Sequence, residues 1–235
     1  MYAVITGASK GIGKAIANIF ASHGCNLILC SKGELDLYKA VADLQIRFPS
    51  VIVKAKPFDL SKDAKAFGDW VLENKISPTI LINNAGYFEP GNVYNEPEGL
   101  LEKQIETNLY SAYHLTRKLL PTMMANATKN NPKHIFNICS VASLQAYPNG
   151  GAYSISKFAM AGFSKNLRQE MLPHHIKVTT VYPGAVFTNS WKGFDNTDNR
   201  IMEADDVAKI IFAASQLSVS ACVEELILRP QQGDL

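Results

Sequence analysis

Hydrophobic positions along this chain form short β-branched runs that alternate with amphipathic segments. Each run is bounded by turn residues and has the length of a buried strand. The runs cover residues 3–6, 27–30, 51–53, 79–82, 134–138, 178–181 and 226–228. Consecutive residues of a strand point to opposite faces of a sheet, and these runs are apolar at consecutive positions. The pattern therefore predicts seven strands of a sheet that is covered on both sides.

The segments between the runs have the period of amphipathic helices. Residues Ile12, Ala15, Ile16 and Phe20 fall on one helical face, and Gly24 provides a stop signal after them. Further helices are predicted near residues 101–124, 153–171 and 207–214. Strand and helix thus alternate almost throughout, as in right-handed βαβ units.

This alternation predicts an α/β fold, a Rossmann-type doubly wound parallel sheet of about seven strands with helices on both faces. A length of 235 residues, with no internal repeat and no long linker, favours one domain over residues 1–235. Two polar loops, at residues 87–99 and 189–200, are expected to lie over a site. Ligands should bind where the parallel strands end.

Composition and charge exclude several classes of function. Lys and Arg total 23 and Asp and Glu total 21, a balance that does not favour nucleic acid or an anionic membrane as partner. The four cysteines form no CxxC pair, so neither a zinc site nor a disulfide scaffold is expected. The chain enters its first strand at once and contains no apolar run of membrane-spanning length, so we expect a cytoplasmic location.

A glycine-rich turn follows the first predicted strand and leads directly into the first helix. Its glycines are Gly7, Gly11 and Gly13. Glycine allows a tight backbone path and a close approach of a pyrophosphate to the amides at the helix start. Strand, turn and helix together predict a dinucleotide site, whereas three glycines alone would also fit a simple packing turn.

The end of the second strand favours NADP(H) over NAD(H), although NAD(H) stays possible. NAD-preferring sites usually carry an acid there to hold the ribose hydroxyl, and this chain has Ser31 and Lys32. Lys10 and Lys32 could flank a 2′-phosphate as compact cations. The alternative is that both lysines are ordinary solvated surface charges.

Candidate catalytic side chains lie where later strands end. Tyr153 and Lys157 are four residues apart in a predicted helix and therefore share one face. We expect the nearby ammonium to lower the phenol pKa and make Tyr153 a proton donor. Ser140 follows the strand at residues 134–138, and the segments 83–86 and 182–184 end two other strands, so all four features should converge on one cleft.

These motifs, in this order, resemble the short-chain dehydrogenase/reductase family. The resemblance rests on the turn at residues 6–13, the segment 83–86, Asn108, Ser140, Tyr153 with Lys157, and Pro183-Gly184 with Thr188. It implies an oxidoreductase that interconverts a carbonyl and an alcohol by hydride transfer, assembled as a homodimer or homotetramer through the helices near 101–124 and 153–171.

The resemblance also implies residue roles. Tyr153 is the acid/base, Ser140 holds the carbonyl oxygen, Lys157 lowers the tyrosine pKa and binds the nicotinamide ribose, and Asn108 holds a relay water. The cofactor-binding residues implied, besides Tyr153 and Lys157, are Gly7, Ser9, Lys10, Gly11, Ile12, Gly13, Ser31, Lys32, Asp59, Asn84, Ala85, Gly86, Pro183, Gly184, Val186 and Thr188.

The substrate is the least determined part of the reading. The chain ends without the motifs typical of 3-oxoacyl carrier-protein reductases and looks more like the branch of hydroxy acid dehydrogenases. We therefore expect a small 3-hydroxy acid or 3-oxo substrate, with Lys192 and Arg200 near its carboxylate. The expected pocket lining is Phe88, Gln145, Tyr147, Val186, Trp191 and Phe194.

Two further substrate classes and one function of another class stay open, and a third class of enzyme is disfavoured. An uncharged carbonyl compound or a carrier-bound 3-oxoacyl thioester could be the substrate of the same chemistry. A catalytically idle NADPH sensor would keep the glycine turn but would not need the Ser, Tyr, Lys and Asn set together. A nucleotide-sugar epimerase or dehydratase shares the Tyr and Lys pair, yet 235 residues leave no space for its extra substrate domain.

Overall fold

A seven-stranded parallel sheet forms the centre of the computed structural model, which describes residues 1–188, 191 and 193–234. The strand order is β3-β2-β1-β4-β5-β6-β9, with the chain order reversing between β1 and β4. The strands are β1 Tyr2–Thr6, β2 Asn26–Ser31, β3 Val53–Pro57, β4 Ile80–Asn83, β5 Lys133–Ile138, β6 Ile176–Pro183 and β9 Glu225–Leu228. The predicted Rossmann-type architecture is confirmed.

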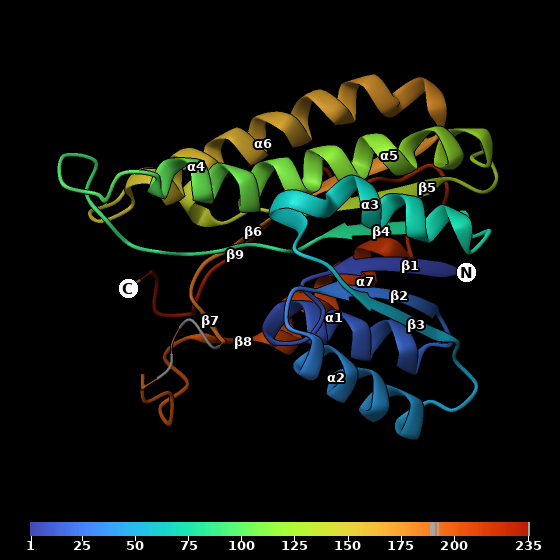
Figure 1. The fold of residues 1–235 in the computed structure, drawn as a ribbon, viewed down its shortest axis with the longest axis horizontal. Helices are drawn as coiled ribbons and strands as arrows, with labels where there is room; N and C mark the ends of the chain where they lie inside the picture. The colour runs from blue at the N-terminus through green and yellow to red at the C-terminus, as the bar shows by residue number, and fades with distance from the viewer. Residues whose placement is uncertain (189–190, 192, 235) are drawn as a thin grey trace.

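Helices cover both faces of this sheet, as Figure 1 shows. One face carries α1 Gly11–Ser22, α2 Glu34–Arg47 and α7 Ala204–Ser215. The other carries α3 Leu60–Glu73, α4 Leu100–Ile105, α5 Ser111–Ala125 and α6 Gly151–Met171. A π-helical turn, Glu106–Tyr110, joins α4 to α5, and single 3₁₀ turns occupy Val141–Ser143 and Leu172–His174.

Alternating strand residues supply the two halves of the core. In β1, Ile5 packs with Ile16 and Phe20 of α1, whereas its neighbour Val4 packs with Phe67 of α3 and Leu115 of α5. This alternation follows from the two-residue period of a strand. It explains why the central strands are apolar at nearly every position.

The third strand does not lie where the sequence predicted it. The apolar run at 51–53 overlaps the strand only at Val53, from which β3 continues through Lys54 and Lys56 to Pro57. Because β3 is an edge strand, only part of its surface is covered and lysines are tolerated. Two further short strands, β7 Val186–Phe187 and β8 Met202–Glu203, pair with each other beyond the main sheet and were not predicted.

The chain is folded so that its functional segments meet at one end of the sheet. The turns after β1, β4, β5 and β6 all lie at the carboxyl edge, and the C-terminal tail returns to this edge beside β6 and β9 (Figure 1). Across the described ranges, every helix is too short or too polar to cross a membrane.

Candidate active site

The glycine-rich turn leaves the start of α1 open to an anionic ligand. Gly7 and Gly11 adopt left-handed backbone, with φ of +64° and +51°. A Cβ on Gly13 would overlap the backbone oxygen of Gly7 and lie 2.5 Å from Nδ2 of Asn84. Lys10 occupies the N-cap, but its side chain turns to Asp36 instead of the helix amides. These amides therefore suit a pyrophosphate.

The segment after β4 is locked against this turn. The Thr6 hydroxyl accepts hydrogen bonds from the backbone N–H groups of Asn84 and Ala85, both at 2.9 Å. The Asn84 side chain donates in return to the backbone oxygens of Thr6 and Gly7, at 2.9 and 3.3 Å. A cleft of about 300 Å³ lies beside these segments, and its lining also includes Gly86, Ile138 and Lys157. Its glycine-rich wall fits a dinucleotide.

The two lysines expected to flank a 2′-phosphate each hold a carboxylate in this structure. Lys10 lies 2.7 Å from Asp36, and Lys32 lies 2.7 Å from Asp59. Partial burial opposes ionisation of Asp59, but its bonds to Lys32 and Ser61 outweigh this and hold the pKa of that carboxyl below its usual value. A 2′-phosphate would have to share both cations with these acids.

Ser31 closes the end of β2 without offering an acid. Its side chain is buried and donates a hydrogen bond to the backbone oxygen of Gly33 at 3.3 Å. The last residue of β2 is therefore a hydroxyl and not the acid that NAD-preferring sites carry there, although the carboxylates of Asp36 and Asp59 lie close by on Lys10 and Lys32.

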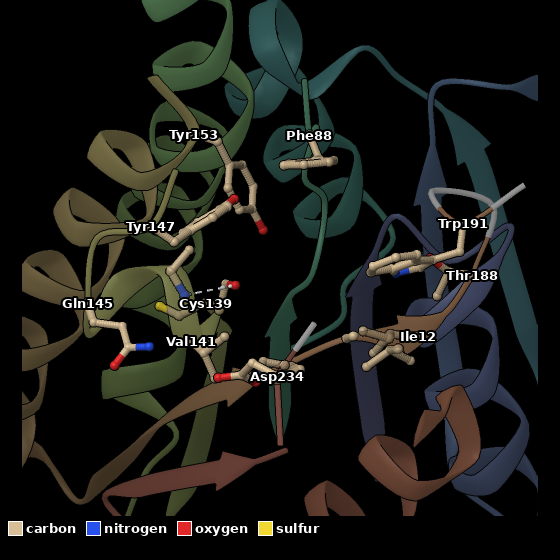
Figure 2. Close-up of a pocket in the computed structure, with 16 residues that line it drawn as sticks. Ile12, Phe88, Cys139, Val141, Gln145, Tyr147, Tyr153, Thr188, Trp191 and Asp234 are labelled. Atoms are coloured by element: carbon tan, nitrogen blue, oxygen red, sulfur yellow. Dashed lines mark hydrogen bonds between the residues drawn. The ribbon is translucent and has the colours of Figure 1, made fainter. Parts of the chain in front are cut away.

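Tyr153, Ser140 and Lys157 meet at one wall of the site. Ser140 follows β5, where its Oγ accepts a hydrogen bond from the N–H of Ala142 at 3.2 Å and fixes the adjoining turn. Its side chain also interacts with the Tyr153 phenol. Figure 2 shows that phenol projecting from α6 into the open cleft. Lys157, one helical turn on, has its Nζ 5.8 Å from the centroid of the Tyr153 ring.

The pKa of Tyr153 departs from the prediction. Burial raises it to about 12, and the hydrogen bond with Ser140 only partly offsets this. Lys157 was expected to lower it, but the ammonium is itself buried and donates to the backbone oxygen of Ile138 at 3.1 Å. Burial also lowers the pKa of Lys157. The phenol therefore keeps its proton in the free protein.

Asn108 lies in the π-helical turn between α4 and α5, in an interior position. Its Oδ1 accepts from the N–H of Tyr87 at 2.7 Å, and its Nδ2 donates to the backbone oxygen of Tyr87 at 2.9 Å and to Oγ of Ser156 at 2.8 Å. A π-helical turn frequently marks a functional position. Here it brings one amide into contact with both the segment after β4 and the helix α6.

The larger cleft opens beside Tyr153 and has a volume of about 450 Å³. Tyr147, Tyr153 and Gln145 face Ile12, Thr188 and Trp191 across it, with Phe88 at its rim (Figure 2). Pro183, Gly184 and Val186 also line it. Five of the six predicted lining residues are therefore present, whereas Phe194 contacts the ring of Trp191 and does not line the cleft.

The C-terminal tail contributes a residue that the sequence did not indicate. Asp234 lies at the cleft beside Val141 (Figure 2) and forms an ion pair with Arg229. Arg200 was expected to face a substrate carboxylate, but it donates to the backbone oxygens of Gly233 and Asp234 at 3.0 and 3.1 Å. Lys192, its expected partner, lies outside the described residues. No local pattern marks Asp234, because only the returning tail brings it to the cleft.

Comparisons with known proteins agree with this geometry. Residues 1–199 match the family model described as short chain dehydrogenase. The chain is 31% identical over 242 residues to a sepiapterin reductase of Chlorobaculum tepidum, covering 99% of this chain and 97% of that protein. It is 36% identical over 193 residues to dehydrogenase/reductase SDR family member 7B of Xenopus tropicalis, covering 79% of this chain and 61% of that protein.

A solved structure with a bound nucleotide shares the whole fold. It is an alcohol dehydrogenase from the archaeon Thermococcus sibiricus, complexed with 5-hydroxy-NADP. The TM-score is 0.88 at 27% sequence identity, and the match covers 98% of this chain and 96% of that chain.

Proposed function

Because the chain belongs to the short-chain dehydrogenase family, and is thus an oxidoreductase, we propose that it reduces a small carbonyl compound with NADPH, or runs the reverse reaction. The observation that carries the proposal is the meeting of the Tyr153 phenol, the Ser140 hydroxyl and the Lys157 ammonium at the junction of two clefts. One cleft fits a dinucleotide and the other a small substrate.

The assignment of NADP(H) is supported by charge and by a relative. The end of β2 offers the hydroxyl of Ser31 instead of an acid. Lys10 and Lys32 lie beside it as cations that a 2′-phosphate would share with Asp36 and Asp59. The solved relative from Thermococcus sibiricus binds a modified NADP. Gly7, Ser9, Gly11, Ile12 and Gly13 would hold the phosphates. Asp59, Asn84, Ala85, Gly86, Pro183, Gly184, Val186 and Thr188 would contact the remaining parts.

In the proposed reaction, NADPH would supply the hydride that reduces the carbonyl carbon when it is bound. Tyr153 donates its proton to the carbonyl oxygen as negative charge develops there. The hydroxyl of Ser140 donates a hydrogen bond to the same oxygen and orients it. Lys157, held by the backbone oxygen of Ile138, binds the nicotinamide ribose and stabilises the phenolate that remains. Asn108 holds the helix and the loop that flank these groups.

The charge of the cleft favours an uncharged substrate. Among the described lining residues of the larger cleft, Asp234 is the only charged side chain. The guanidinium of Arg200 is engaged with the tail. Asp234 is itself paired with Arg229, and the described lining of this cleft offers no cation to hold a substrate carboxylate. We therefore place small neutral ketones and aldehydes ahead of the 3-oxo acids that the sequence favoured.

A substrate panel tests this proposal. NADPH oxidation is measured with a neutral diketone, a matched 3-oxo acid and a carrier-bound 3-oxoacyl thioester, and each is repeated with NADH. We expect the highest kcat/KM for the neutral compound with NADPH. A higher value for the acid or the thioester would reject the substrate assignment, and a higher value with NADH would reject the cofactor assignment. NADPH binding with no turnover of any carbonyl would favour the sensor function.

We also propose that the chain forms a homodimer or homotetramer. Leu101, Tyr110, Ile155 and Phe158 lie on the neighbouring helical segments around α4 and α6, and they are between 39% and 46% exposed. Apolar side chains gathered on one face are typical of an interface. Light scattering at micromolar concentration should give a dimer or tetramer, and Phe158→Glu should dissociate it. A monomeric wild type would reject this assembly.

A further inference from the structure

The loop between β4 and α4 is fastened at several points along the active site. At its start, the backbone N–H and oxygen of Tyr87 both bond to the side chain of Asn108. Further on, the N–H of Gly91 donates to the backbone oxygen of Asn149 at 3.0 Å, and Asn92 Oδ1 accepts from the N–H of Asn149 at 3.2 Å. We call residues 87–96 the strap. It joins Asn108 to the segment that precedes α6.

Glu96, at the end of the strap, caps the helix that carries the catalytic pair. Its Oε1 accepts a hydrogen bond from the N–H of Ala152, in the first turn of α6, at 2.7 Å. The residue at the N-cap is Gly150, which has no side chain with which to satisfy these amides. A carboxylate at a helix start also interacts favourably with the positive end of the helix dipole. Glu96 thus replaces a local cap from 56 residues away.

Packing at this junction is tight. A Cβ on Gly151 would overlap both Oε1 of Glu96 and the backbone oxygen of Gly91. The strap therefore lies directly on the first turn of α6. Movement of the strap would be transmitted to the helix start, because closely packed segments cannot shift independently.

Tyr153 follows Ala152 and is held by the same strap from a second direction. The ring of Phe88 packs edge-on against the ring of Tyr153, with centroids 4.8 Å apart and an interplanar angle of 79°. Figure 2 shows Phe88 and Tyr153 on adjoining sides of the cleft mouth. Residues 87–96 therefore hold both the ring of Tyr153 and the backbone of the residue before it.

We propose that Glu96 is a positioning residue, which fixes the first turn of α6 and thereby aims the Tyr153 hydroxyl at the substrate oxygen. This inference rests on the proposed function, in which Tyr153 is the proton donor. Glu96 acts as a hydrogen-bond acceptor, so Gln at this position should preserve the effect and Ala should remove it. A small displacement of an acid from its acceptor lowers the rate without weakening cofactor binding.

Kinetics of three variants test the proposal. Glu96→Ala should lower kcat about tenfold. Glu96→Gln should stay within about twofold of the wild type, since the amide oxygen still accepts from Ala152. Glu98→Ala is the matched control, because Glu98 lies in the same loop and is exposed. Affinity for 2′,5′-ADP should be equal in all variants. Wild-type kcat in Glu96→Ala, or an equal loss in Glu96→Gln or Glu98→Ala, would overturn the proposal.

A second measurement needs no turnover and separates this inference from the proposed function. Hydrogen exchange at the Ala152 amide and ultraviolet titration of the Tyr153 phenol are followed, with Tyr153→Phe as the blank. Glu96→Ala should speed the exchange and let the phenolate form at lower pH, whereas Glu96→Gln should do neither. Unchanged exchange and titration in Glu96→Ala would overturn the positioning role. If Glu96→Ala shows both the faster exchange and the shifted titration, but the wild-type protein reduces no carbonyl compound, only the proposed function is rejected.

Discussion

Replacement of Tyr153 by phenylalanine gives the sharpest test of the chemistry. The structure raises the pKa of the Tyr153 phenol to about 12, against an ordinary value of 10. One pKa unit corresponds to about 1.4 kcal/mol, so the site favours the neutral phenol by about 3 kcal/mol. At pH 9 only about one phenol in a thousand is then ionised. The proton needed for carbonyl reduction is present throughout the neutral range.

Tyr153→Phe keeps the ring and its contact with Phe88 and removes only this proton. We expect kcat for carbonyl reduction to fall by about 10² to 10⁴, the usual contribution of a general acid. Cofactor affinity, measured by fluorescence, should stay near that of the wild type. Tyr147→Phe is the matched control, because Tyr147 lines the same cleft and burial also raises its pKa to about 12. It should retain most of the activity.

Two results would refute the reasoning. Turnover of Tyr153→Phe within a few fold of the wild type would show that another group supplies the proton. A phenolate absorbance that appears near pH 8 in the wild type and is missing in Tyr153→Phe would show that burial does not control the phenol. In that case, the influence of Lys157 expected from the sequence would exceed that of burial.

Three further predictions concern the cofactor site and stability. Gly13→Ala should weaken NADPH binding at least about tenfold, because the new Cβ would overlap the backbone of Gly7. Gly162→Ala is its control, since no described atom lies near the new Cβ, and it should bind NADPH as the wild type does. Equal affinities of the two variants would contradict the prediction. Asp36→Asn should raise affinity for 2′,5′-ADP about two- to fivefold and leave 5′-AMP unchanged, because it frees Lys10 for the phosphate. Asp43→Asn, which removes the partner of Lys14 on the same helix, is the control and should leave the affinity for 2′,5′-ADP unchanged. A weaker affinity for 2′,5′-ADP in Asp36→Asn would contradict the competition between Asp36 and the phosphate for Lys10. Burial lowers the pKa of His134 to about 3, so the unfolded chain binds the extra proton and stability is lost as pH falls from about 6.5 toward 3. Between pH 7 and 4.5, chemical denaturation should show that the free energy of unfolding falls by up to about 3 kcal/mol less in His134→Gln than in the wild type. An identical fall in both proteins would contradict this prediction.

The sequence determined the features that depend on neighbouring residues. Six of the seven sheet strands follow from short apolar runs. For the five strands inside the sheet, the reason is that a buried central strand needs apolar residues on both faces. The path of the glycine-rich turn follows from the positions that require glycine, as the positive φ of Gly7 and Gly11 shows. Tyr153 and Lys157 share a side of α6 because they are one helical turn apart.

Tertiary structure decided the features that depend on which distant segments meet. The third strand moved to 53–57 because an edge strand is covered only in part. Lys10 and Lys32 were predicted as cations for a phosphate, and the fold gave each of them a carboxylate partner as well. The Tyr153 pKa followed from burial instead of from its helical neighbour.

The residues around the substrate illustrate the same limit. Glu96 reaches Ala152 across 56 positions, and Asp234 reaches the cleft through a returning tail. Neither residue belongs to a periodic pattern or a recognisable motif. The environment of each residue arises from the packing of separate loops. The strength of a hydrogen bond or of an interaction between charges depends on that environment. Local sequence patterns therefore specified the fold and the reacting groups. The packing of distant segments set the pKa values, the charge partners and the orientation of these groups.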